Sequence, residues 1–281
     1  MKLECRHRCS QIALNELVDG LCNVIEMTEE SNKNIILQHL TTLQTQYRRN
    51  KVYMNHWAYI PPKKIVMGYE YLTFQGKTLR KAQCGYYIPI ENILKNLLNI
   101  PHIREWFRTS NMQISNTKIW SDINHGSCIA QNPYFVGNEY TAKLIMFYDD
   151  CEFCNPIGAR TKKHTMGFVY VTFSDIPPMN RSSYSSVFLL AVARTRNIKK
   201  FGLGTLMKQF IVSLQELDTG KEMQIEENEK ILMRGRLVSI PCDSLGSSFI
   251  GGFKMPGPFS NKPCRMCNVS SLTISNVTKI S

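Results

Sequence analysis

The stretch KLIMFYDD at residues 143–150 is an apolar run that ends in two carboxylates, and it opens the part of the chain that decides the fold. Two further runs of strand character follow, MGFVYVTF at 166–173 and VFLLAVA at 187–193. Residues 201–217 then place Leu and Phe at helical spacing, and a fourth strand pattern occupies 231–240. This order predicts an α/β fold with three strands, a helix, a fourth strand and a short helix.

Acidic residues follow two of these predicted strands. Asp149 and Asp150 end the first strand, and Asp243 comes after the fourth. If the two strands lie side by side and parallel, their carboxyl ends meet at one edge of the sheet, where ligand sites form in open α/β sheets. Carboxylates held close together need cations between them, and a pair of Mg²⁺ or Mn²⁺ ions suits phosphodiester chemistry. The pattern indicates a catalytic metal site formed by Asp149 or Asp150 with Asp243, and capping of a helix or turn is the alternative.

Three regions are expected along the chain. Residues 1–108 are predicted to be mainly helical, with a short mixed region after Pro61-Pro62. Residues 109–140 are polar, rich in Asn, Ser and Gly, and are expected to form a linker or long connection. Residues 141–281 form the α/β core. The expected N-terminal helices cover 10–25, 32–49 and 91–99, and their Leu and Ile stripes suit either a core or a seam of self-association.

Composition narrows the classes of protein to consider. The 281 residues include 34 Lys and Arg against 22 Asp and Glu, which gives a formal net charge of +12. No apolar run is long enough to span a membrane, and the first residues lack a signal-peptide pattern, so an intracellular protein, nuclear or cytoplasmic, is expected. The ten Cys residues are then better read as thiols or metal ligands than as disulfides.

The basic excess makes DNA the first candidate partner. Most of that excess falls in the second half of the chain. The candidate phosphate-binding residues are Arg181, Arg194, Arg196, Lys199 and Lys200. An ordinary solvated face is the alternative interpretation of the same residues.

Several short motifs, taken together, resemble one family. They are YDDCEFCNPIG at 148–158, Lys163-His164, IPPMNRS at 176–182, KKFG at 199–202, CDSLG at 242–246, GGF at 251–253 and CRMC at 264–267, with PPKK at 61–64 and YYIPIENIL at 86–94 further upstream. In number and order these motifs resemble the DDE/D-type DNA transposases, in particular those of CACTA-like pattern. The resemblance implies an RNase H-like core that cuts and joins DNA with two Mg²⁺ or Mn²⁺ ions, with Asp149 or Asp150 as the first ligand and Asp243 as the second.

The chain departs from that family at the third carboxylate, which should follow the fourth strand. Asp243 is the last acidic residue in the sequence. We therefore expect an incomplete RNase H-like core, that is, the remnant of a truncated transposase without strand-transfer activity. The alternative is a domesticated, non-catalytic factor that binds DNA or protein.

A second metal site is conceivable near the end of the sequence. Cys264 and Cys267 have the spacing of one half of a zinc site, and Cys151 and Cys154 form a similar pair beside the first aspartates. Structural zinc needs four ligands, so Zn²⁺ is expected only if the two pairs come together. Unmetallated thiols are the alternative.

Overall fold

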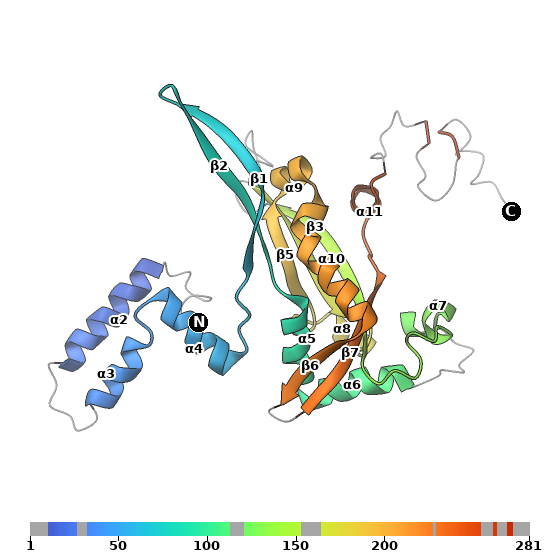
Figure 1. Ribbon diagram of the computed structural model, residues 1–281, viewed down its shortest axis with the longest axis horizontal. Helices are drawn as coiled ribbons and strands as arrows, with labels where there is room; N and C mark the ends of the chain where they lie inside the picture. Colours follow the sequence, from blue (N-terminus) through green and yellow to red (C-terminus); the bar gives the residue numbers. More distant parts are fainter. Residues whose placement is uncertain are drawn as a thin grey trace. The chain divides into compact units, whose positions relative to one another are not determined.

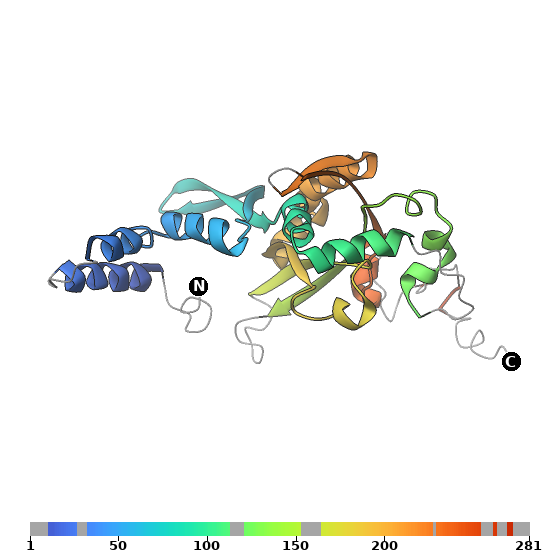
Figure 2. The ribbon, with the colours of Figure 1, turned by 90° about the horizontal axis from the view of Figure 1, so that it is seen from below.

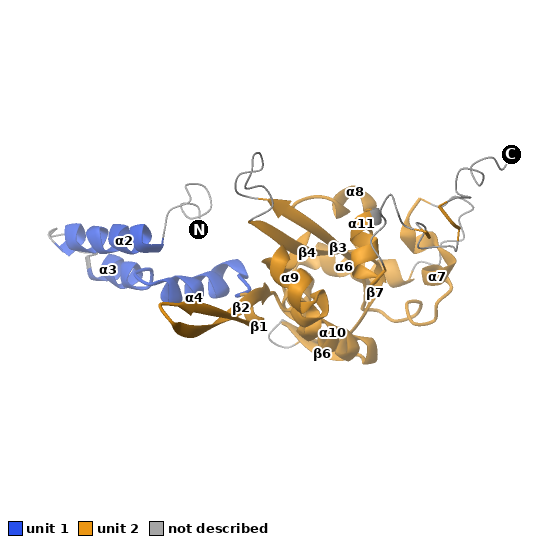
Figure 3. Ribbon diagram, turned by 90° about the horizontal axis from the view of Figure 1, so that it is seen from above, with its two compact units in different colours: residues 1–61 blue, residues 62–281 orange. Residues whose placement is uncertain are grey.

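The computed structural model describes residues 11–26, 33–112, 121–152, 164–226, 229–253, 261–262 and 269–271. It divides the chain into two compact units, residues 1–61 and residues 62–281 (Figure 3). The division falls inside the predicted, mainly helical region 1–108, next to Pro61-Pro62. None of the described helices combines the length and the apolar composition that crossing a membrane requires.

The described residues of the first unit form the helices α2 (Gln11–Glu26), α3 (Lys33–Thr41) and α4 (Gln46–Trp57). Leu14, Val18 and Cys22 form the buried side of α2 at the spacing expected for one helical face. The predicted helix over 32–49 is divided in two, because the Thr45 side chain accepts a hydrogen bond from the Arg48 N–H and caps a new helix there.

The second unit is built on a curled, mixed sheet of seven strands with the order β1-β2-β5-β4-β3-β7-β6 (Figure 1). The strands are β1 (Lys63–Phe74), β2 (Lys77–Tyr87), β3 (Thr141–Glu152), β4 (Thr165–Phe173), β5 (Phe188–Arg194), β6 (Lys221–Glu226) and β7 (Glu229–Ser239). All neighbouring pairs are antiparallel except β3 and β7, which are parallel. The first and fourth strands of the predicted core are therefore parallel neighbours, which is the condition that the carboxylate hypothesis sets.

Helices pack around this sheet and connect its strands. They are α5 (Ile90–Leu98), α6 (Pro101–Met112), the short turns η1 (Ile123–His125), α7 (Ser127–Ala130) and α8 (Pro178–Arg181), then α9 (Thr195–Phe201), α10 (Leu203–Thr219) and α11 (Ser244–Ile250). The apolar side of α10 buries Leu206, Phe210 and Leu217, as its helical spacing predicts. Figure 1 shows α10 lying along the sheet, and Figure 2 shows α6 running crosswise below it.

After Pro61-Pro62, where we expected a short mixed region, the chain forms the hairpin of β1 and β2. Its strands are joined by Gln75 and Gly76, both at positive φ, the conformation of the two-residue turns that suit twisted hairpins. Residues 121–140, expected as part of a linker, include η1 and α7, which line a cavity of the second unit. The α/β class is confirmed, and the sheet is larger than the predicted core.

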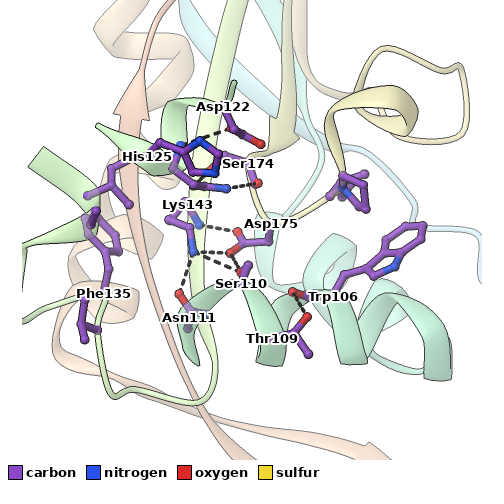
Figure 4. A pocket seen from close by; sticks show the side chains of 16 residues that line it. Trp106, Thr109, Ser110, Asn111, Asp122, His125, Phe135, Lys143, Ser174 and Asp175 are labelled. Carbon is purple, nitrogen blue, oxygen red and sulfur yellow. Dashed lines mark hydrogen bonds and ion pairs between the residues drawn. The ribbon is translucent and has the colours of Figure 1, made fainter. Parts of the chain in front are cut away.

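A buried ion pair links β3 to α6 and to the segment that follows β4 (Figure 4). Lys143 Nζ lies 2.7 Å from Asp175 Oδ1, and their side chains are 1% and 0% exposed. Asp175 also accepts from the Lys143 N–H at 2.8 Å and from the Ser110 hydroxyl at 2.6 Å, while Lys143 donates to Asn111 Oδ1 at 2.7 Å. The network joins α6, β3 and the end of β4, and its satisfied hydrogen bonds make the buried charges tolerable.

We expect Lys143→Met to lower the free energy of unfolding by about 3–5 kcal/mol, because the substitution leaves the Asp175 carboxylate buried without its cation. Urea denaturation would measure the change. Lys95→Met, on the exposed side of α5, is the matched control and should have little effect. The double variant Lys143→Met/Asp175→Asn should recover part of the loss. An unchanged stability in Lys143→Met would contradict the structural role of the pair.

Candidate functional site

The parallel pairing of β3 and β7 brings the candidate carboxylates to one end of the sheet. In the register, Ile145 of β3 lies opposite Ser239 of β7. Asp149 and Asp243 each come four residues after these partners. The two strands are therefore adjacent, as the carboxylate hypothesis requires, although their pairing ends before the aspartates and β3 continues past them to Glu152.

Asp149 and Asp150 point to opposite faces of β3, because successive side chains of a strand alternate. Asp150 shares its face with Tyr148, whose hydroxyl donates to Asp150 Oδ1 at 2.7 Å. The hydroxyl of the buried Thr195, at the start of α9, donates to the same oxygen at 2.8 Å. Asp149 Oδ1 instead accepts from the Asp150 N–H at 2.8 Å. A group on one face of β3 can therefore contact Asp149 or Asp150, but not both.

Asp243 caps the helix that follows it. Its Oδ1 accepts from the Gly246 N–H at 2.6 Å, which is the N-cap arrangement that we set beside the metal hypothesis. The helix α11 lies against β3, since the rings of Phe249 and Tyr148 are 5.5 Å apart. Asp150, which shares the face of Tyr148, is therefore on the α11 side of β3, and Asp149, our first choice as a ligand, is on the other side.

Gly167 on β4 makes room for this cluster. A Cβ at that position would lie 2.8 Å from the Tyr148 hydroxyl and 3.0 Å from Asp150 Oδ1, closer than side chains tolerate. The pKa of Tyr148 is raised well above its usual value of about 10, first by burial and then by the hydrogen bond to Asp150 and the charges of both aspartates. The phenol therefore stays protonated and keeps donating to Asp150.

The ligands needed for a metal centre do not come together in the described residues. There, no group of three or more His, Cys, Asp or Glu side chains is placed to hold an ion. Asp150 and Asp243 each already accept hydrogen bonds from the protein. These carboxylates, as arranged, do not fit a pair of Mg²⁺ or Mn²⁺ ions, and we derive no catalytic step through a metal. The zinc hypothesis is untested, because Cys264, Cys267 and Cys154 lie outside the described residues.

The five basic candidates fall into three groups. Arg181 is directed inward: its side chain is 17% exposed, pairs with Asp122 at 2.8 Å and donates to the carbonyls of Ser174 and Ile176. Arg196 and Lys200, on α9, both pair with Glu70 of β1 at 2.7 and 3.1 Å and remain about half exposed. Arg194 and Lys199 are exposed. Four of the five are therefore at the surface, and Arg181 has a structural role in holding α8.

Two features were missed by the sequence analysis. One is the cavity of about 200 Å³ beside the Lys143–Asp175 pair, lined also by Trp106 and His125 (Figure 4). Its polar residues come from segments far apart in the chain, and no local motif marks them. The other is the exposed β1–β2 hairpin, for which the clustered Lys, Arg and aromatic residues at 63–87 were a visible indication.

Comparison with models of known protein families found no match for the chain, and a search of curated proteins found no relative. The fold defines an α/β protein with a curled seven-stranded mixed sheet. The resemblance to DDE/D transposases rests on the sequence motifs alone.

Stability should decline as the pH rises above about 10, in part through Tyr148. Because the folded state keeps this phenol protonated while the unfolded chain releases the proton near its usual pKa, the unfolded state binds fewer protons above that pH and becomes favoured. Tyr148→Phe should therefore make unfolding free energy depend less steeply on pH between about 9 and 11. Tyr184→Phe, at a fully exposed ring, is the control. Equal pH slopes in the two variants would argue against the raised pKa.

Proposed function

We propose that this chain is a DNA-binding protein related to DDE/D transposases, and that the present chain binds duplex DNA without cutting it. The observation that carries the proposal is the parallel pairing of β3 with β7, because these are the strands that lead to Asp149, Asp150 and Asp243 in the sequence. The order β5-β4-β3-β7, with α9 and α10 between β5 and β7, supports it because it is the order that an RNase H-like core would have. The hairpin of β1 and β2 and the edge strand β6 are additions to that core.

The side-chain contacts favour binding over catalysis. Asp150 receives two hydroxyl hydrogen bonds and Asp243 caps α11, so both carboxylates have roles in holding secondary structure together. Phosphoryl transfer with metal ions depends on ligands that position the ions closely, and small displacements are costly.

Electrostatics supports DNA as the partner. The chain carries a formal net charge of +12, and four of the five basic candidates are exposed. Phosphate contacts of this kind are independent of base sequence and release bound counterions, so the affinity falls as salt is added.

Fluorescence anisotropy with a labelled duplex should show binding that weakens by about a hundredfold between 50 and 200 mM salt, as expected for about four phosphate contacts. A duplex of the same length and shuffled sequence should bind equally well. Failure of the chain to bind at about 50 mM salt would contradict the proposal.

The chain should not nick supercoiled plasmid when Mn²⁺ or Mg²⁺ is supplied, because its carboxylates are not arranged as a metal-ligand set. Asp243→Ser is the informative control, since a serine keeps the helix cap and removes the carboxylate. Nicking by the parent chain that disappears in Asp243→Ser would show that the carboxylates do act on DNA and that the non-catalytic interpretation is wrong.

A further inference from the structure

The β1–β2 hairpin forms an arm that extends beyond the sheet of the second unit (Figure 1). Its two strands pair along their whole length, from Lys63 with Tyr87 to Phe74 with Lys77. Gly85, Tyr86 and Tyr87 pair with β5, and among the described residues the outer part of the hairpin has no further strand neighbour. At about 3.3 Å per residue, the seven residues from Gly68 to Phe74 correspond to an arm of roughly 23 Å.

The arm is basic. It carries Lys63, Lys64, Lys77, Arg80 and Lys81 against a single acidic residue, Glu70. Glu70 is itself paired with two cations of α9, Arg196 and Lys200. The positive charges of Lys77, Arg80 and Lys81 are therefore not neutralised by an acidic residue of the hairpin.

The register divides the arm into two faces, because residues directly opposite one another in a hairpin project to the same side. Glu70 lies opposite Lys81, and Phe74 lies opposite Lys77. These residues share one face, and the contacts of Glu70 direct that face toward α9. Lys77 and Lys81 therefore lie on the same side of the arm as Arg196 and Lys200. Arg80 is on the other face, where its guanidinium lies 3.6 Å above the centre of the Tyr69 ring.

Charged residues on an exposed strand commonly serve only to prevent pairing with other chains. That explanation does not account for the apolar side chains beside them. Phe74 at the tip is 64% exposed, and Leu72 and Leu79 on the same face are about half exposed. Large exposed apolar side chains among cations are unfavourable in water and are typical of surfaces that meet a ligand.

We propose that this face of the arm binds duplex DNA, with Lys77 and Lys81 on the phosphates, Phe74 against the bases or sugars, and Arg196 and Lys200 continuing the contact onto α9. The inference rests on the proposed DNA-binding function and names the surface that performs it. A two-stranded β-ribbon fits the major groove of B-DNA, which is about 12 Å wide. Charge complementarity selects a polyanion over a second copy of this basic chain as the occupant.

The proposal is tested by measuring how the affinity of the full chain for duplex DNA changes with salt concentration. Each phosphate contact contributes about 0.9 to the slope of log affinity against log salt, so Lys77→Gln/Lys81→Gln should reduce that slope by about 2. Its matched control is Lys95→Gln/Lys230→Gln, which removes two exposed charges elsewhere and should leave the slope unchanged. Arg80→Gln, on the opposite face of the same arm, should also leave it unchanged.

Phe74→Ser provides a second measurement that does not depend on charge. It should weaken binding by about fivefold or more at constant salt slope, because the apolar contact of the ring with the groove is lost while the charge stays the same. Circular dichroism of each variant should match the parent chain, because the substituted side chains are exposed.

The outcomes separate the two proposals. If the parent chain binds DNA and Lys77→Gln/Lys81→Gln keeps the full salt slope, the arm is not the binding surface and the proposed function stands. If Arg80→Gln lowers the slope as much as the Lys variant, the assignment to one face is wrong. If the parent chain does not bind DNA, both proposals are overturned.

Discussion

The parallel pairing of β3 with β7 is the contact on which the rest of the second unit depends. Two parallel strands cannot be joined by a tight turn, so the chain needs a long crossover connection between them. Here the connection passes through β4, β5, α9, α10 and β6 before β7 returns beside β3. The pairing encloses α10 against the sheet and leads directly into α11, whose Phe249 contacts Tyr148 of β3. The pairing also makes the strand that carries Asp149 and Asp150 the neighbour of the strand that leads to Asp243.

Hydrogen bonding within that end of the sheet determines what the carboxylates can do. A carboxylate that accepts from two hydroxyls or from a helix N–H is held in place by the protein, and an ion would have to compete with those donors. Tyr148 illustrates the coupling: its burial and its contact with Asp150 raise its pKa, and the protonated phenol in turn holds Asp150. A cluster of this kind stabilises the junction of β3, α9 and α11.

Much of the core could be predicted because its patterns are local. The runs at 143–150, 166–173 and 187–193 became β3, β4 and β5 with shifts of a few residues, and the leucine spacing of 201–217 became α10. The β1–β2 hairpin was missed because its outer strands are exposed on both faces and lack apolar alternation, and because its turn uses Gln75 before Gly76 where Asn or Asp is the stronger indication. Arg181 was assigned to DNA from its charge, and nothing near it in sequence indicates its pairing with Asp122, 59 residues away.

Hydrophobic periodicity and composition act over short distances along the chain, so the α/β class, the basic charge and the order of the core elements can be predicted from the residues alone. Only the tertiary structure decided which face each aspartate occupies, that Asp243 caps a helix, that Lys143 is buried against Asp175, and that the cations of the hairpin and of α9 lie on one side. Those outcomes depend on hydrogen bonds and ion pairs between residues tens of positions apart, and such partners are selected by the packing of the whole unit.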